Sequence, residues 1–79
     1  MNRLNHALPL CDLMEGQTAR VTEILLSGPM RRRLRDLGMI EGTPVKCLQK
    51  SPFGDPSAYR IRGAAIALRK EDSREILVC

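Results

Sequence analysis

The stretch that decides the fold of this chain is Arg31-Arg32-Arg33-Leu34-Arg35-Asp36-Leu37-Gly38-Met39-Ile40-Glu41-Gly42. Met30, Leu34 and Leu37 recur at i, i+4 and i+7, which predicts one apolar stripe along a helix. Gly38 can adopt the left-handed conformation that commonly closes a helix. A helix of about nine residues is too short to be stable alone, so we expect it to pack against a sheet.

Both ends of this helix carry local signals. Ser27 or Gly28 can cap it, and Pro29 suits its first position because the missing N–H would be unpaired there anyway. After the helix, Glu41 and Gly42 predict a turn with the glycine at the position that needs a positive φ. The chain is then expected to pass directly into a strand.

Alternating and β-branched residues predict five short strands, at 18–26, 45–50, 59–62, 65–68 and 75–79. Residues 10–14 predict one helical turn on the core, 51–56 a loop with two prolines, and 70–73 a turn. The fold class is therefore mainly β with short helices (α+β), a small barrel with one short helix between its first two strands. Residues 1–8 are expected to be a flexible lead-in, and 9–79 a single domain.

Composition limits the classes of protein. The 79 residues are 43% hydrophobic but only 3% aromatic, so the core must be aliphatic. The net charge of +4 is mildly basic, short of the dense charge of a dedicated nucleic-acid binder. No apolar run approaches the roughly 20 residues of a membrane-spanning helix, and no signal peptide is evident. We expect a cytoplasmic protein whose three cysteines are free thiols.

The stretch 31–45 resembles the core signature of the FeoA family. So do Pro-Phe-Gly-Asp-Pro at 52–56, Tyr-Arg-Ile-Arg-Gly at 59–63 and Ala-Leu-Arg at 67–69, together with the opening pattern Leu10, Leu13, Gly16, Ala19 and Val21. The resemblance covers residues 9–78. It implies an SH3-like β-barrel and a small accessory protein of bacterial ferrous iron uptake.

The resemblance also implies a partner. In this family the partner is FeoB, a membrane transporter with a cytosolic guanine-nucleotide-binding domain, which would hold the chain at the inner face of the membrane. The same domain resembles the C-terminal module of DtxR-type metal-dependent repressors. The alternative hypotheses are therefore a regulatory or nucleic-acid-binding SH3-like module, or a metal-responsive interaction domain.

The arginines of the helix have two interpretations. They can form the solvated face of an amphipathic helix. Alternatively, Arg31, Arg32 and Arg35 bind a partner. Arg31, Arg32 and Arg33 are expected in the first turns, where positive charge costs roughly 0.3–1 kcal/mol per residue, and acidic groups on a partner would offset that cost.

Two apolar side chains are further candidates for partner binding. Met39 and Ile40 either both enter the core or leave one side chain exposed beside the arginines, and we select Met39. Phe53 either lies in a rigid turn against the end of the barrel or is exposed as one of few aromatic anchors for an interface. A groove without aromatic rings cannot recognise proline-rich peptides as typical SH3 domains do.

Metal and catalytic chemistry have weak support. His6, Cys11, Cys47 and Cys79 show no paired ligand spacing, so no cofactor and no metal site are predicted within the chain. A site shared between chains through Cys79 or His6, or weak binding of transition metals by Asp12 and Glu15, stays open. Cys47 is better explained as a small buried hydrophobe.

The remaining expectations concern activity and association. No phosphate-binding loop, nucleophile motif or evident pair of acids is present, so the chain is not expected to be an enzyme. Nucleic acid is not expected as a partner, because single-strand binders stack bases on aromatic side chains. Exposed sheet edges leave weak self-association open.

Overall fold

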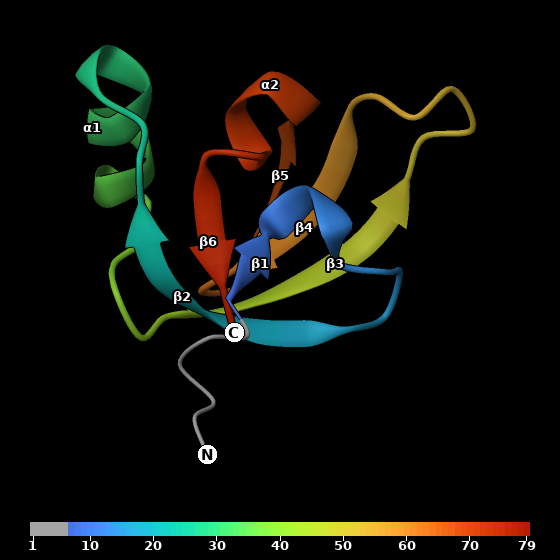
Figure 1. The fold of residues 1–79 in the computed structure, drawn as a ribbon, viewed down its shortest axis with the longest axis horizontal. Coiled ribbons are helices and arrows are strands. Elements are labelled where there is room, and N and C mark those ends of the chain that lie inside the picture. The colour runs from blue at the N-terminus through green and yellow to red at the C-terminus, as the bar shows by residue number, and fades with distance from the viewer. Residues whose placement is uncertain (1–6) are drawn as a thin grey trace.

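The computed structural model describes residues 7–79, which form one sheet with two short α-helices and a 3-10 turn (Figure 1). The elements are, in chain order, β1 (Leu8–Pro9), η2 (Leu10–Asp12), β2 (Thr18–Ile24), α1 (Gly28–Asp36), β3 (Pro44–Lys50), β4 (Ser57–Ile61), β5 (Ala64–Leu68), α2 (Lys70–Ser73) and β6 (Ile76–Val78). This confirms the mainly β class and the helix between two strands. His6 lies outside the described residues.

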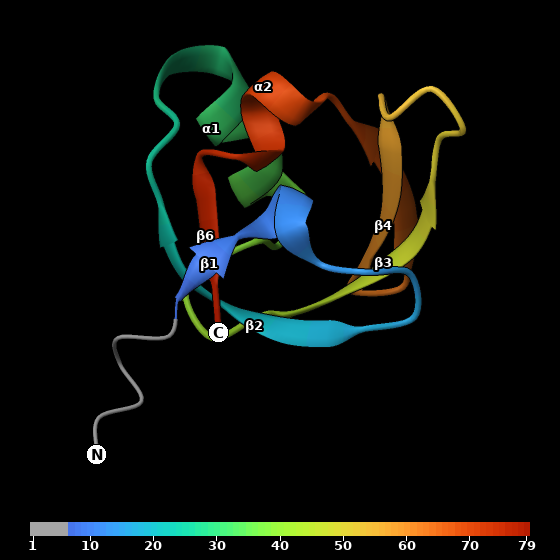
Figure 2. The ribbon, with the colours of Figure 1, turned by 45° about the vertical axis from the view of Figure 1, so that its right-hand side comes forward.

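The six strands form an antiparallel sheet in the order β1-β6-β2-β3-β4-β5. The register of β2 shifts between Val21 and Glu23, and that of β3 shifts between Cys47 and Gln49. Such irregularities bend and twist a strand, so one sheet can wrap around the core (Figure 2). Within residues 7–79 the edges β1 and β5 do not pair with each other, and instead η2 and α2 contact each other.

The core is aliphatic, as the composition predicted, with a single aromatic ring. Successive side chains of a strand point to opposite faces, so Val45 and Cys47 of β3 are buried while Lys46 between them is exposed. The buried cluster consists of Leu10, Leu13, Val21, Leu34, Met39, Val45, Cys47, Tyr59, Ile61, Leu68, Ile76 and Val78.

Helix α1 ends as its glycine predicted. Gly38 has a φ of 94°, its N–H donates to the Arg35 carbonyl at 2.9 Å, and the N–H of Met39 donates to the Leu34 carbonyl at 2.9 Å. These two bonds form a Schellman motif, which satisfies carbonyls that the helix would leave unpaired. Leu34 and Met39, which the second of these bonds joins, both belong to the buried cluster.

A compact loop connects α1 to β3. The N–H of Gly42 (φ 91°) donates to the Val21 carbonyl at 2.7 Å, and the N–H of Thr43 donates to the Ile40 carbonyl at 3.0 Å. The predicted turn is therefore present, with its glycine at a positive φ. Because Gly42 bonds to Val21, the loop is fastened to β2 before the chain enters β3.

Four local predictions need correction. Leu8, expected in the flexible lead-in, pairs with Val78, and a strand of two residues has no alternation to reveal it. Residues 70–73 form a helix, favoured by acidic side chains in its first turn. Strand β2 ends at Ile24, short of residue 26. Met14, expected on the core, is 66% exposed because the helical turn stops at Asp12.

In the described part of the chain, no helix is long and apolar enough to cross a bilayer.

Candidate partner-binding groove

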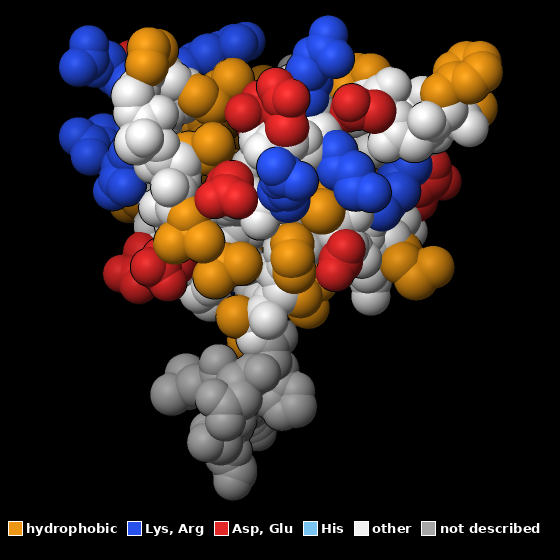
Figure 3. Space-filling view, turned by 45° about the horizontal axis from the view of Figure 1, so that its top comes forward, with side chains coloured by type: hydrophobic (Ala, Val, Ile, Leu, Met, Phe, Trp, Pro, Cys, Tyr) orange, Lys and Arg blue, Asp and Glu red, His pale blue; other side chains and the backbone are white. Residues whose placement is uncertain are grey.

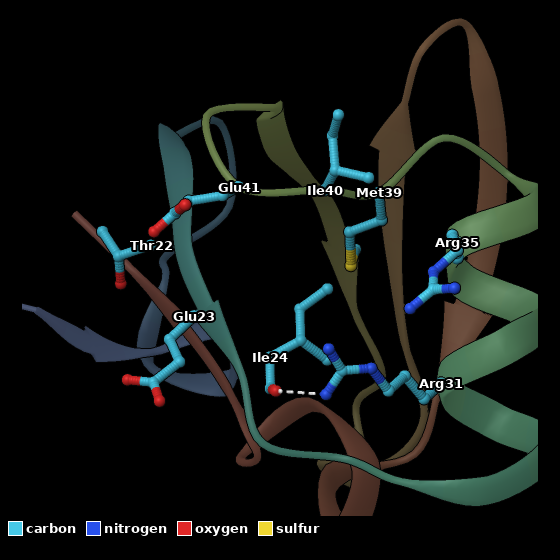
Figure 4. Close-up of a pocket in the computed structure, with 8 residues that line it drawn as sticks. All are labelled: Thr22, Glu23, Ile24, Arg31, Arg35, Met39, Ile40 and Glu41. Atoms are coloured by element: carbon cyan, nitrogen blue, oxygen red, sulfur yellow. Dashed lines mark hydrogen bonds between the residues drawn. The ribbon is translucent and has the colours of Figure 1, made fainter.

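A groove of about 350 Å³ lies between β2, α1 and the loop that follows α1 (Figure 4). We call it the α1–β2 groove. Its lining residues come from three separate segments of the chain: Thr22, Glu23, Ile24, Arg31, Arg35, Met39, Ile40 and Glu41. The helix forms one wall, and β2 with the loop forms the other.

The two walls carry opposite charges. Arg31 and Arg35 extend from α1 into the groove, whereas Glu23 and Glu41 lie on the far wall (Figure 4). In the space-filling view, Lys and Arg side chains project from the edge that α1 forms, and a group of acidic side chains lies below them (Figure 3). A groove with walls of opposite sign can orient a segment that carries both charges.

The backbone of β2 is a second potential contact in the groove. Strand β2 pairs with β3 only from Thr18 to Arg20, and with β6 on its other side as far as Ile24. Within the described chain, residues 22–24 therefore have no strand partner on the side facing α1. An extended segment could pair with such an edge through main-chain hydrogen bonds.

The arginines predicted as partner contacts differ in their surroundings. Arg31 donates from Nη1 to the carbonyls of Ile24 at 3.2 Å and Leu26 at 3.4 Å, which fastens α1 to the end of β2. Arg35 lines the groove, whereas Arg32 is exposed and does not line it.

The expected helix-dipole penalty needs correction at Arg33. Because α1 ends at Asp36, Arg33 falls in its last turn together with Arg35, where positive charge is favourable. The dipole therefore gives no reason to expect an acidic partner near these two residues, whereas the penalty at Arg31 and Arg32 stays a prediction. The charge contrast across the α1–β2 groove is the stronger argument.

Of the two apolar residues after the helix, the exposed one is Ile40. Met39 is 1% exposed and its side chain belongs to the core, so it forms the base of the groove, while Ile40 is 50% exposed at the rim. Met39 is thus a poor candidate for a direct contact. Leu25, at 48% exposure just after β2, is an apolar surface residue that the sequence reasoning missed.

A family model described as the FeoA domain matches residues 8–79. The chain belongs to the FeoA family. It is 32% identical over 69 residues to the Fe(2+) transport protein A/Fe(2+) transporter FeoB fusion protein of Porphyromonas gingivalis. That match covers 87% of this chain and 8% of the fusion protein, so the chain spans a small part of that relative.

Solved FeoA structures share the fold. The FeoA protein of Chlorobium tepidum is 34% identical with a TM-score of 0.85, over 90% of this chain and 68% of that one. FeoA of Stenotrophomonas maltophilia, solved with zinc and described as a prokaryotic SH3 domain protein, is 26% identical with a TM-score of 0.80, over 91% and 89%. The SH3-like fold is therefore confirmed. IdeR of T. acidophilum, at 22% identity and a TM-score of 0.77, shares the fold alone.

The remaining predicted contact of this FeoA-family chain lies elsewhere. Phe53 is 92% exposed in the loop between β3 and β4, so it is not packed against the end of the sheet. That loop lies on the opposite side of the molecule from α1 (Figure 1). Phe53 and the arginines therefore do not form one continuous surface, and a role for Phe53 in binding stays a prediction.

Two buried titratable groups lie away from the groove. Burial raises the pKa of the Cys47 thiol, and the nearby charge of Lys50 only partly opposes this shift. Burial likewise raises the pKa of the Tyr59 hydroxyl, and the nearby Ser73 and Ser57 hydroxyls partly oppose this shift. Within residues 7–79, however, neither serine nor any other group meets hydrogen-bond geometry with the Tyr59 hydroxyl. Both groups are thus protonated at neutral pH, and a protonated thiol is a poor nucleophile and a poor metal ligand.

Metal ligands do not gather in residues 7–79. No group of three or more His, Cys, Asp or Glu side chains there could hold an ion. Cys11, Cys47 and Cys79 are free thiols with partly buried, buried and exposed positions respectively.

Proposed function

We propose that the chain is a non-enzymatic accessory module of ferrous iron uptake, which binds the cytosolic part of an FeoB-type transporter and modulates transport. The observation that carries the proposal is the Porphyromonas gingivalis protein, in which a region 32% identical to this chain is fused to the transporter FeoB. Fusion holds two domains at high effective concentration, which favours a contact between them. Membership of the FeoA family supports the same proposal.

The α1–β2 groove is the proposed contact surface. It offers a charged wall on each side, an exposed apolar residue at its rim in Ile40, and a strand edge at residues 22–24. In residues 7–79 that edge has no strand partner on the groove side, although the Ile24 carbonyl already accepts a bond from Arg31. These features suit an extended segment of the partner that carries an acidic residue opposite Arg35. The chain would act in the cytoplasm, at the inner face of the membrane where its partner lies.

Co-purification with the cytosolic domain of FeoB, with and without guanine nucleotide, tests the proposal. The variant Arg35→Glu reverses a charge inside the groove, and Arg74→Glu makes the same charge change at the end of α2, outside the groove. We expect Arg35→Glu to abolish co-purification and Arg74→Glu to retain it. Failure of the unmodified chain to co-purify in either nucleotide state would refute the proposal.

The alternative of a nucleic-acid-binding module has a separate measurement. Phosphate contacts make affinity fall steeply with salt. Of the two aromatic residues, Tyr59 is buried and only Phe53 is available to stack on a base. A gel shift at low salt, with single-stranded and duplex DNA, would therefore show binding if this alternative holds.

A further inference from the structure

The outward face of the sheet formed by β2, β3 and β4 is cationic. Where all three strands lie side by side, at residues 18–20, 44–46 and 60–61, five side chains are exposed and stay out of the core: Thr18 and Arg20 on β2, Pro44 and Lys46 on β3, and Arg60 on β4. Three of these five positions are positively charged and none is acidic. We call this surface the cationic sheet face.

Two of its charges face each other directly. Lys46 of β3 is the register partner of Arg60 of β4, and both are exposed. Like charges directly opposite on neighbouring strands destabilise a sheet. On its other side Lys46 pairs with the neutral Thr18, so the sheet itself supplies no counter-charge across this row. An external anion would relieve the repulsion.

The third cation of this surface, Arg20, and the adjacent Arg62 are each held by a hydrogen bond to a backbone carbonyl. Arg62 follows β4 and donates from Nε to the Gly38 carbonyl at 2.9 Å, and Arg20 donates from Nη1 to the Gly42 carbonyl at 3.0 Å. Each guanidinium keeps further N–H groups beyond this bond. A depression of about 320 Å³ on this face is lined by Thr18, Pro44, Lys46, Arg60, Arg62 and Gly63.

We infer that the cationic sheet face binds the phosphates of an anionic membrane surface. A bilayer surface presents many negative charges, which suits several cations that project from one face of the sheet. Small exposed side chains, such as Ala65 beside Arg60, let that face approach a plane closely. Juxtamembrane Lys and Arg each strengthen attraction to anionic lipid.

The geometry fits nucleic acid less well. Reading the major groove requires a protruding helix or a two-stranded ribbon, whereas these cations lie on the face of a sheet. Binding single strands uses stacking on aromatic rings, and none of the outward positions named above is aromatic. The inference is independent of the proposed transporter contact, because it uses other residues and needs no FeoB.

Co-sedimentation with lipid vesicles tests the inference. The unmodified chain is expected to bind vesicles of phosphatidylcholine mixed with phosphatidylglycerol, to ignore vesicles of phosphatidylcholine alone, and to dissociate as salt is raised. The double variant Lys46→Gln/Arg60→Gln is expected to bind about 30-fold more weakly, at roughly fivefold per charge. It should unfold no earlier than the unmodified chain, because it removes a repulsion.

The matched control is Arg33→Gln/Arg74→Gln, which lowers the net charge by the same two units at exposed positions on α1 and after α2. It is expected to retain vesicle binding. Equal losses in the two double variants would overturn the inference, because net charge alone would then explain the attraction. No binding to phosphatidylglycerol vesicles at low salt would also overturn it, and binding of polyglutamate or duplex DNA instead would assign the face to those partners.

Discussion

The side chain of Arg62 lies across Gly38. Its Nε donates to the Gly38 carbonyl at 2.9 Å, and its Cδ is 2.5 Å from where a Cβ on that glycine would stand. Gly38 follows the C-terminal cap of α1, whereas Arg62 begins the turn between β4 and β5 with a φ of 47°. The contact therefore joins the helix terminus to a hairpin that is remote in sequence.

Gly38→Ala is predicted to destabilise the fold for two separable reasons. The φ of 94° disfavours any residue with a Cβ, at a cost of about 1–2 kcal/mol. The new Cβ also displaces Arg62, and losing its hydrogen bond costs about 1 kcal/mol more. Urea unfolding of Gly38→Ala, Arg62→Ala and the double variant measures both terms.

The double variant separates them. Arg62→Ala is expected to lower stability in the unmodified chain but to have little further effect once Gly38 is alanine, since the hydrogen bond is already gone. If Arg62→Ala costs the same in both backgrounds, the two residues are not coupled and the steric explanation fails.

Thr43→Val is predicted to cost about 1–2 kcal/mol. Thr43 is 2% exposed, and its hydroxyl donates to the Gly38 carbonyl at 3.1 Å and accepts from the N–H of Ile40 at 3.1 Å. Valine keeps the shape and removes both bonds, so the loss would show as a lower urea midpoint. Thr43→Ser keeps the hydroxyl and is expected to stay closer to the unmodified chain, whereas equal stability of Thr43→Val would show that the loop does not depend on this bond.

Substitutions of Arg31 and Arg35 are predicted to differ in their effect on the stability of the fold, although both residues line the groove. Arg31→Gln removes the bonds to the carbonyls of Ile24 and Leu26 and is expected to cost about 0.5–1 kcal/mol at this exposed site. Arg35→Gln is expected to stay within about 0.5 kcal/mol of the unmodified chain. Thermal unfolding compares them, with Arg32→Gln as control, and a ranking in which Arg35→Gln is the less stable would contradict this assignment.

The helix and its exit were predictable because their determinants are local. A stripe of three apolar residues and the glycines at 38 and 42 encode α1, the Schellman motif and the following turn within a short stretch. The groove was only half predictable. Its arginines belong to that stretch, but Glu23 and Ile24 reach it from β2 because of sheet pairing, which no local pattern reports.

The sequence pattern also could not predict which of the two apolar residues after α1 is exposed. Met39 and Ile40 are adjacent and both apolar, and the bond from Met39 to the Leu34 carbonyl decides which one turns inward. Strand β1 was not predicted for a similar reason, since Leu8 is in a strand only because it pairs with Val78, which is remote in sequence.

Tyr59→Phe is predicted to stabilise the fold by about 1 kcal/mol at neutral pH, because the buried Tyr59 hydroxyl has no hydrogen-bond partner among residues 7–79. The substitution should also change how the stability of the fold depends on pH at alkaline values. Since burial raises the Tyr59 pKa above its ordinary 10.0, the folded state keeps a proton that the unfolded chain loses, so stability is full below pH 10.0 and falls above it. Burial also raises the pKa of the Cys47 thiol above its ordinary 9.0, so Cys47 likewise lowers the free energy of unfolding as pH rises above 9.0. In Tyr59→Phe the contribution of Cys47 to this loss of stability should remain and that of Tyr59 should disappear.

Urea unfolding across this pH range measures both effects, with Tyr59→Leu as a control that leaves a cavity and costs about 2–4 kcal/mol. A less stable Tyr59→Phe at neutral pH would mean that the hydroxyl makes a bond in solution.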